Sequence, residues 1–358
     1  MTRDCDLRDG RERPWDAAAA VDAATRQASM GILKRATSGP VVGRSVLPPI
    51  TFATYVVLLG LFVVTRGLPL DRLWQALWII AGITAAMAGR PISDYFRVLR
   101  DWSLFFAVLL LYDHTRGIAD TLGMPLHVSD IAAVEKAMFG GIMPSEWLQN
   151  HLYDPAHLHW YDVALSLVYL SHFCTIWIIG AVIYVRSREA WGGYARRALG
   201  LSVAGLLTYI LVPAAPPWWA ANAGVIGDVE RISSQGWTSL GLHGASAALE
   251  SAQAGVNRVA ALPSLHAAFA LLVVLILWPH TRAGALRGVL VLYPLAMGLA
   301  LVYFGEHYVA DVILGLIYVV VVVLLARTYE RQRIPESSPS HGSDDRVEVV
   351  GGMGLPRR

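Results

Sequence analysis

The apolar residues of this chain are gathered into blocks long enough to cross a lipid bilayer as helices, a crossing that needs about 20 residues. Eight such runs lie near residues 49–66, 72–88, 99–118, 160–185, 197–215, 259–279, 285–304 and 307–327. Only 16% of the 358 residues are charged, whereas soluble domains carry about 25%. We therefore expect an all-α protein, a polytopic membrane bundle of about eight transmembrane helices.

The lysines and arginines are distributed unevenly between the loops, which predicts how the bundle sits in the membrane. Cytoplasmic loops are normally enriched in these residues. With the N-terminus in the cytoplasm, the inner segments hold 23 of them and the outer segments hold 6. The distribution predicts a multi-pass protein of the plasma membrane with both termini cytoplasmic. The long connections 119–159 and 216–258 then lie outside, and because such loops often carry function, we expect an extracytoplasmic active site.

The same reading divides the chain into four segments. Residues near the C-terminus are rich in proline, serine, glycine and charge, which is typical of disorder. We expect a partly disordered cytoplasmic tail over 1–48, two additional N-terminal transmembrane helices over 49–98, a catalytic membrane domain over 99–327 and a disordered cytoplasmic tail over 328–358.

Three residues near the ends of two predicted spans carry the candidate chemistry. His266 lies at the outer start of the sixth span and His307 at the outer start of the eighth, so both imidazoles are expected on one face. Asp311 follows His307 by four residues, which places the two on one side of a helix. A carboxylate there can orient the imidazole as a nucleophile. His266 can protonate a departing oxygen, because an imidazole titrates near neutral pH.

Phosphate-binding groups are predicted at the same place. Helix N-termini attract anions through unpaired N–H groups, Ser264 adds a hydroxyl, and the guanidinium groups of Arg116 and Arg258 match phosphate oxygens. Both arginines have an alternative reading, in which they extend to lipid headgroups. Four further residues are candidates for a substrate pocket: Tyr112, Asp113, Tyr308 and His172. For His172, a structural hydrogen-bonding role inside the membrane is equally open.

Two short motifs resemble a known family. Pro263-Ser264-Leu265-His266 and His307-Tyr308-Val309-Ala310-Asp311 resemble the P-S-G-H and S-R-x5-H-x3-D motifs of the type 2 phosphatidic-acid phosphatase superfamily. The resemblance implies a six-helix core and metal-independent catalysis through a phosphohistidine. It assigns His307 as nucleophile, Asp311 as its orienting carboxylate, His266 as acid and Ser264 as phosphate ligand.

The departures from the family motifs indicate a particular branch. Leu265 replaces the motif glycine, and Ala300 and Leu301 stand where the serine and arginine would be. The variant motifs P-S-L-H and H-Y-x-x-D are similar to those of inositol phosphorylceramide synthases and bacterial inositolphosphotransferase-like proteins. Arg116 and Arg258 are then the expected substitutes for the missing phosphate ligands.

The resemblance implies an integral-membrane lipid phosphotransferase acting on a lipid that carries a phosphate or phosphodiester, with a polyol such as inositol as a candidate acceptor. Two alternatives remain open: a lipid phosphate or diphosphate phosphatase that uses water as acceptor, and a non-catalytic transporter or scaffold. We expect no cofactor, no metal site and no nucleic-acid partner, since the histidines of the first outer loop lack a regular ligand spacing.

Overall fold

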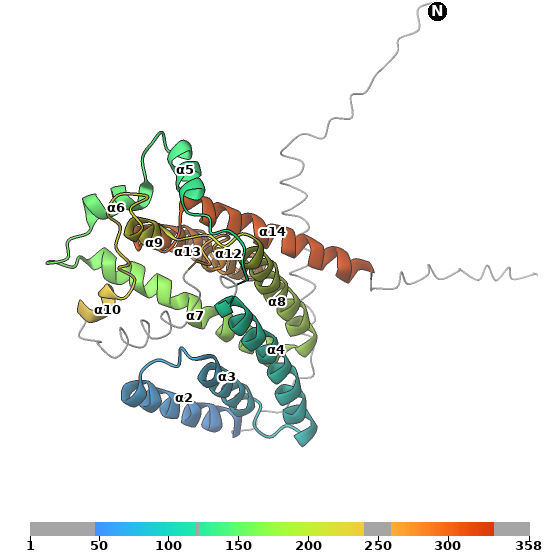
Figure 1. The fold of residues 1–358 in the computed structure, drawn as a ribbon. Coiled ribbons are helices and arrows are strands. Elements are labelled where there is room, and N and C mark those ends of the chain that lie inside the picture. Colours follow the sequence, from blue (N-terminus) through green and yellow to red (C-terminus); the bar gives the residue numbers. More distant parts are fainter. Residues whose placement is uncertain (1–46, 119–121, 240–258, 333–358) are drawn as a thin grey trace, which may run out of the picture.

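The computed structural model describes residues 47–118, 122–239 and 259–332, and over these ranges its regular elements are helices (Figure 1). The eight longest are α2 (Leu47–Arg66), α3 (Arg72–Ala86), α4 (Ile92–Ile118), α7 (Trp160–Arg186), α8 (Arg188–Leu211), α12 (Leu265–Leu277), α13 (Gly284–Tyr303) and α14 (Val309–Gln332). Shorter helices are α5 (Ser129–Met138), α6 (Pro144–Leu152), α9 (Pro217–Asn222), α10 (Gln235–Ser239) and the 3-10 turn η2 (Trp278–His280). Each predicted span overlaps one of the eight, and the all-α membrane bundle is confirmed.

Four of these helices are both long and apolar enough to cross a membrane within the described part of the chain. They are α2, α7, α13 and α14, with mean hydropathies of 2.1, 1.8, 1.9 and 2.9. Helix α12 is apolar but has only 13 residues, and α3 has only 15. The multi-pass character therefore stands, while the count of eight crossings stays a prediction.

Several helices begin where capping groups dictate rather than where the apolar block begins. Helix α8 starts at Arg188, because the Ser187 hydroxyl accepts from the N–H of Ala190 at 3.2 Å. Helix α12 starts at Leu265, after its N-cap Ser264. Helix α4 starts at Ile92, so it crosses the boundary expected at residue 98, and the segment division itself stays a prediction. The two predicted tails fall almost wholly outside the described residues.

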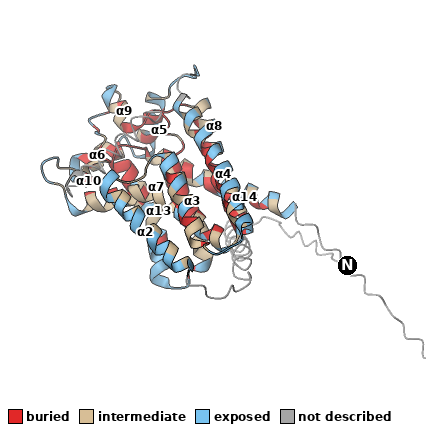
Figure 2. Ribbon diagram, turned by 90° about the horizontal axis from the view of Figure 1, so that it is seen from below, coloured by how far each residue is buried: buried red, intermediate tan, exposed pale blue. Residues whose placement is uncertain are grey.

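Many of the exposed residues of the bundle are large and apolar. Figure 2 shows where the exposed residues lie along the helices. Helix α2 has no buried residue, and Val57, Leu61 and Val64 are among its many exposed apolar side chains. An apolar surface of this extent marks a contact with another phase or partner. Together with the span lengths, it fits a bundle whose outer side chains face lipid.

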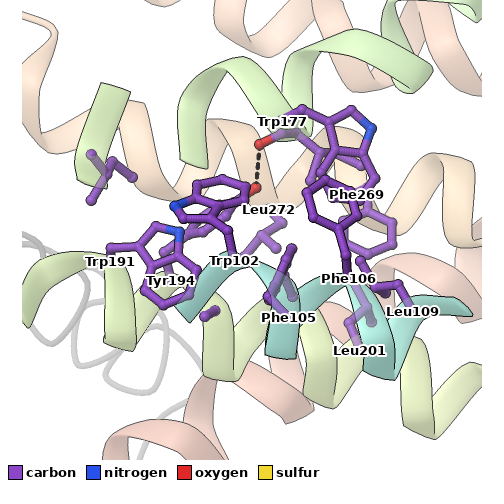
Figure 3. Packing of buried hydrophobic residues seen from close by; sticks show 14 of the residues in the cluster. Trp102, Phe105, Phe106, Leu109, Trp177, Trp191, Tyr194, Leu201, Phe269 and Leu272 are labelled. Atoms are coloured by element: carbon purple, nitrogen blue, oxygen red, sulfur yellow. Dashed lines mark hydrogen bonds between the residues drawn. The ribbon is translucent and has the colours of Figure 1, made fainter. Parts of the chain in front are cut away.

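Aromatic side chains from α4, α7 and α8 form the largest core cluster (Figure 3). Phe106 stacks on Trp177 with 5.1 Å between ring centroids. The Tyr194 hydroxyl donates to the carbonyl of Ile176 at 2.6 Å, so this buried hydroxyl is satisfied. The cluster fixes α4 against α7 and α8, and side chains from α4 and α12 line the same cavity.

The short helices α5, α6, α9 and α10 lie at one end of the bundle, called here the site end (Figure 1). Three extended segments join there in parallel: the N–H of Ala214 donates to Val259 at 2.8 Å, and the N–H of Ala215 donates to His127 at 2.9 Å. The buried Gln149 of α6 donates to the carbonyls of Glu230 and Tyr303, both at 2.8 Å. The connections are thus tied to the ends of the long helices.

Candidate active site

The predicted pair of His307 and Asp311 forms at the start of α14. His307 Nδ1 lies 3.5 Å from Asp311 Oδ2, and both side chains are buried. The same carboxylate oxygen accepts from the N–H of Tyr308 at 2.9 Å. His307 precedes the first residue of α14, so the expectation that both residues sit within one helix is wrong. The turn before the helix nevertheless brings the imidazole over the carboxylate.

His266 meets His307 from the neighbouring helix, as expected. It is the second residue of α12, and its ring centroid lies 5.6 Å from that of His307. Two side chains of α7 hold it: Tyr169 stacks on the ring at 5.3 Å, and His172 lies 4.2 Å away. Two imidazoles and one carboxylate from distant parts of the chain therefore converge, with a third imidazole beside them.

A cavity of about 190 Å³ opens at this cluster. His172, His266 and His307 line it, and so do Tyr112 and Asp113 from the end of α4. Its other walls are mainly apolar, from side chains of α4, α7 and α12: Phe105, Leu109, Phe173, Ile176, Trp177, Leu265 and Phe269. Three of the four predicted pocket residues thus share the cavity.

The fourth predicted pocket residue and the predicted phosphate-binding serine lie elsewhere. Tyr308 is fully buried in a cluster with Ile131 and Met143, away from the cavity lining. Ser264 is also fully buried, and its hydroxyl accepts from the N–H of Ala267 at 3.4 Å as the cap of α12. Its own N–H donates to the carbonyl of Asp311 at 3.0 Å. The geometry gives Ser264 a positioning contact between α12 and α14.

Three guanidinium groups line the cavity, and sequence reasoning assigned a role to one of them. Arg116, as expected, lies there with its guanidinium 5.5 Å from the ring centroid of Tyr209. Its Nε is buried and has no hydrogen-bond partner among the described residues. Arg258 falls outside the described residues. Arg72 and Arg231 were missed, although both were among the few cations on the predicted outer side.

Arg231 is held by a carboxylate that also lines the cavity. Its Nε and Nη2 donate to the two oxygens of Glu306 at 2.9 and 3.0 Å. The hydroxyl of Ser233 donates to Glu306 at 2.7 Å, and the guanidinium lies 5.3 Å from the ring centroid of Trp218. Burial alone would lower the pKa of Arg231, but the charge of Glu306 more than offsets this and raises it.

The N-terminus of α14 does not offer free N–H groups to a phosphate. The N–H groups of Val309 and Ala310 donate to the carboxylate of Glu135 at 2.8 and 3.1 Å, and that of Tyr308 donates to Asp311. Glu135 is fully buried, and burial raises the pKa of its carboxyl despite these two hydrogen bonds. The expectation of anion binding at this helix end is therefore wrong, because two side chains of the protein already occupy it.

Comparison with known proteins agrees with this geometry. Residues 129–325, more than half of the chain, match the family model described as the PAP2 superfamily. A phosphoinositol dihydroceramide synthase of Bacteroides thetaiotaomicron is 27% identical over 246 residues, which cover 64% of this chain and 75% of that protein. No solved structure matches the chain significantly. The matched region includes His266, His307 and Asp311, whereas α2, α3 and α4 precede it.

Proposed function

The chain belongs to the PAP2 superfamily, and from this premise we propose that it is an integral-membrane lipid phosphotransferase working through a phosphohistidine on His307. One observation supports this most strongly. The buried Asp311 carboxylate lies against Nδ1 of His307, which leaves Nε2 as the nucleophilic atom, and the His266 ring lies 5.6 Å away. A nucleophile held by an orienting group, with an acid beside it, is what two-step group transfer requires.

In the first step, Nε2 of His307 attacks the phosphorus of the lipid donor. An N–P bond forms, the P–O bond to the leaving alcohol breaks, and His266 gives its proton to the departing oxygen. In the second step, a hydroxyl of the acceptor gives its proton back to His266 and attacks the same phosphorus. The N–P bond then breaks and His307 is regenerated.

Arg116 and Arg231 are the proposed phosphate clamp. Both line the cavity that contains the two histidines. Guanidinium groups there can neutralise the charge on the non-bridging oxygens as it develops in each step. Arg231 is kept in place by Glu306, while the unpartnered Nε of Arg116 leaves a donor for a phosphate oxygen. We assign phosphate binding to this guanidinium pair because the first N–H groups of α14 and the Ser264 hydroxyl already have hydrogen-bond partners within the protein.

Transfer to an alcohol is favoured over hydrolysis by the similarity to a protein named as a synthase of phosphoinositol dihydroceramide. From the same similarity we infer that the transferred group is phosphoinositol and that the acceptor is a long-chain lipid alcohol. The apolar side chains among the cavity walls suit the tails of a lipid. Water as acceptor, which gives a phosphatase, remains the alternative. The proposed site lies at the extracytoplasmic face, following the charge distribution.

The test is His307→Ala, assayed with purified protein in lipid nanodiscs. Headgroup-labelled phosphatidylinositol and dihydroceramide are supplied, and the lipid products are separated and identified by mass spectrometry. We expect turnover to fall on the order of a thousandfold or more, because removing one member of a coupled catalytic set abolishes most of the rate. His280→Ala, an exposed histidine at the far end of α12, should retain activity.

Each result of this assay has a definite meaning. Label bound covalently to wild-type protein, acid-labile and absent from His307→Ala, would support the phosphohistidine. Free inositol phosphate as the sole product would indicate the phosphatase alternative. Turnover that survives His307→Ala, with the variant still folded, would overturn the assignment of the nucleophile.

A further inference from the structure

We propose that the ion pair between Arg72 and Asp113 is a binding subsite for a polyol ring of the substrate, an inference that rests on the proposed function. Arg72 opens α3, and Asp113 lies near the end of α4. Arg72 Nε and Nη2 donate to the two carboxylate oxygens of Asp113 at 2.7 and 3.0 Å. Both residues line the cavity that contains His266 and His307.

The pair is held rigidly by further contacts. Arg72 Nη1 donates to the side-chain oxygen of the buried Gln75 at 3.1 Å, and the guanidinium lies 5.1 Å from the ring centroid of Trp177. Trp177 belongs to the aromatic core cluster (Figure 3). A site whose polar groups are fixed in advance binds its ligand without a large ordering cost.

The pair keeps unused hydrogen-bonding capacity, which distinguishes it from the other ion pair of the cavity. The Arg72 and Asp113 side chains remain 24% and 36% exposed. Glu306, the partner of Arg231, is only 9% exposed and also accepts from Ser233. Each carboxylate oxygen of Asp113 accepts one bond from Arg72 and has room for another donor.

The charge arrangement selects the ligand chemistry. A carboxylate repels phosphate, so the Asp113 side of the cavity is unsuited to the transferred phosphorus. Neighbouring hydroxyl groups suit it well, because they donate to the carboxylate while their oxygens accept from the guanidinium. Arg116, three residues after Asp113, lines the same cavity and is part of the proposed clamp. A phosphate on Arg116 and an attached polyol ring on Arg72 and Asp113 form one continuous ligand.

The subsite also lies outside the residues that match the family model. That match begins at residue 129, after α3 and α4. The family region therefore supplies the two histidines and Asp311, while the preceding helices supply the groups proposed to choose the substrate. This division gives the two N-terminal helices of the 49–98 segment a role, since Arg72 comes from one of them.

The experiment compares two donors in nanodiscs, phosphatidylinositol and phosphatidic acid, by the ratio of their kcat/KM values. Asp113→Asn keeps the size of the side chain and removes its charge. We expect the ratio of kcat/KM for phosphatidylinositol to kcat/KM for phosphatidic acid to fall about tenfold to a hundredfold. This is the range that one hydrogen bond to a charged group contributes, about tenfold to a hundredfold. Arg72→Lys, which keeps the charge and loses the planar fork, should shift the ratio in the same direction.

A matched control lies on the same helix. Asp101 of α4 also pairs with an arginine of another helix, Arg188, at the end away from the cavity. Asp101→Asn should leave the donor ratio unchanged. A further arm supplies free myo-inositol with phosphatidic acid. Formation of an inositol phosphate that Asp113→Asn prevents would show the ring entering as acceptor, whereas an effect confined to phosphatidylinositol would show it entering with the donor.

The outcomes separate this inference from the proposed function. If Asp113→Asn leaves the ratio unchanged, or lowers turnover of both donors equally, the polyol subsite is overturned while catalysis by His307 stands. If wild-type protein turns over neither donor, or if His307→Ala remains as active as wild type, the proposed function fails first.

Discussion

Individual charged side chains determine which cations in this cavity are available to a substrate. Three arginines line it together with two carboxylates, Asp113 and Glu306, and each carboxylate is paired with one of the arginines. Arg116 is the cation whose Nε lacks a partner among the described residues. A buried donor without a partner is costly unless a ligand completes its hydrogen bonds. An oxygen of a bound phosphate could accept that hydrogen bond, which fits a site for an anionic substrate.

Arg231→Gln tests the proposed phosphate clamp. The change removes one guanidinium from the cavity and leaves Glu306 without its main partner. We expect inhibition by inorganic phosphate to weaken about tenfold to a hundredfold, measured as the inhibition constant in the lipid-transfer assay. Arg282→Gln, an exposed arginine in the turn before α13, is the control and should behave like wild type. An unchanged inhibition constant for Arg231→Gln would remove this residue from the clamp.

At the scale of helices, the site depends on how closely α12 and α14 approach. A Cβ built on Gly315 of α14 would lie 2.2 Å from the carbonyl oxygen of Ser264, the cap of α12. No side chain fits into that contact. The same approach allows the N–H of Ser264 to donate to the carbonyl of Asp311. The small residue therefore sets the distance between α12, which carries His266, and α14, which His307 directly precedes.

Gly315→Ala should separate the two helices and destabilise the protein by about 1–3 kcal/mol, the usual cost of overpacking. A lower unfolding temperature in detergent, together with reduced turnover, is the expected result. Gly288→Ala in α13 is the matched control, because a Cβ there meets nothing within 4 Å. That change should be neutral or stabilising, since alanine favours helix over glycine. Equal unfolding temperatures for both variants would contradict the packing argument.

Helix α5 contacts the site through Glu135, whose buried carboxylate accepts from the first N–H groups of α14. Burial, and then the nearby charge of Asp311, raise the pKa of this carboxyl above 4.5 in the folded protein. Because the pKa of Glu135 is higher in the folded than in the unfolded protein, the protonated carboxyl stabilises the fold. This contribution is complete at pH values below the unfolded-state pKa and is lost as pH rises through the folded-state pKa. The net contribution of this carboxyl to the stability of the folded protein is therefore largest in acid.

Glu135→Gln removes this titration. We expect the unfolding temperature of wild type minus that of the variant to decrease as pH rises from about 4.5 through the folded pKa. Thermal unfolding in detergent across a pH series measures this difference. Lys136→Gln, at the next position of α5, should give a difference that is constant over the same range. A wild-type advantage that grows with pH would show that the carboxylate is stabilised rather than penalised by its surroundings.

At the scale of the whole molecule, the two ends of the bundle differ in chemistry. The site end gathers the histidines, the cavity and the short helices (Figure 1). The opposite end carries ion pairs between long helices: Asp101 with Arg188, and Glu330 with Arg196 and Arg197. Exposed apolar side chains lie on the helices between the two ends. This difference between the two ends is consistent with a single orientation of the bundle in the membrane.

Cysteine labelling tests that orientation. In a background with Cys5→Ser and Cys174→Ala, His157→Cys places a thiol on an exposed loop at the site end, and Arg282→Cys places one at the other end. Because arginine-rich loops stay cytoplasmic, we expect a membrane-impermeant maleimide to label position 157 in intact cells and position 282 only after permeabilisation. The reverse pattern would put the site in the cytoplasm.

The helices and the meeting of the histidines were predictable from the sequence because both depend on local or simple geometric rules. Apolar blocks of bilayer length determine where the long helices lie, and an inward and an outward span between His266 and His307 return the second residue to the level of the first. The family motifs assigned roles to the same residues. Sequence reasoning misplaced Ser264, whose hydroxyl caps its own helix α12, and Tyr308, which packs against residues from distant parts of the chain.

The rest of the site was decided only by tertiary structure. Glu135 reaches the N-terminus of α14 across 174 residues of sequence, and Arg231 reaches Glu306 across 75. Arg72 reaches Asp113 from a helix outside the catalytic segment. No periodicity or spacing encodes such contacts, because they depend on how segments far apart in the sequence pack together. Buried polar groups must find partners wherever the fold supplies them, and those partners determine which cations remain available to a substrate.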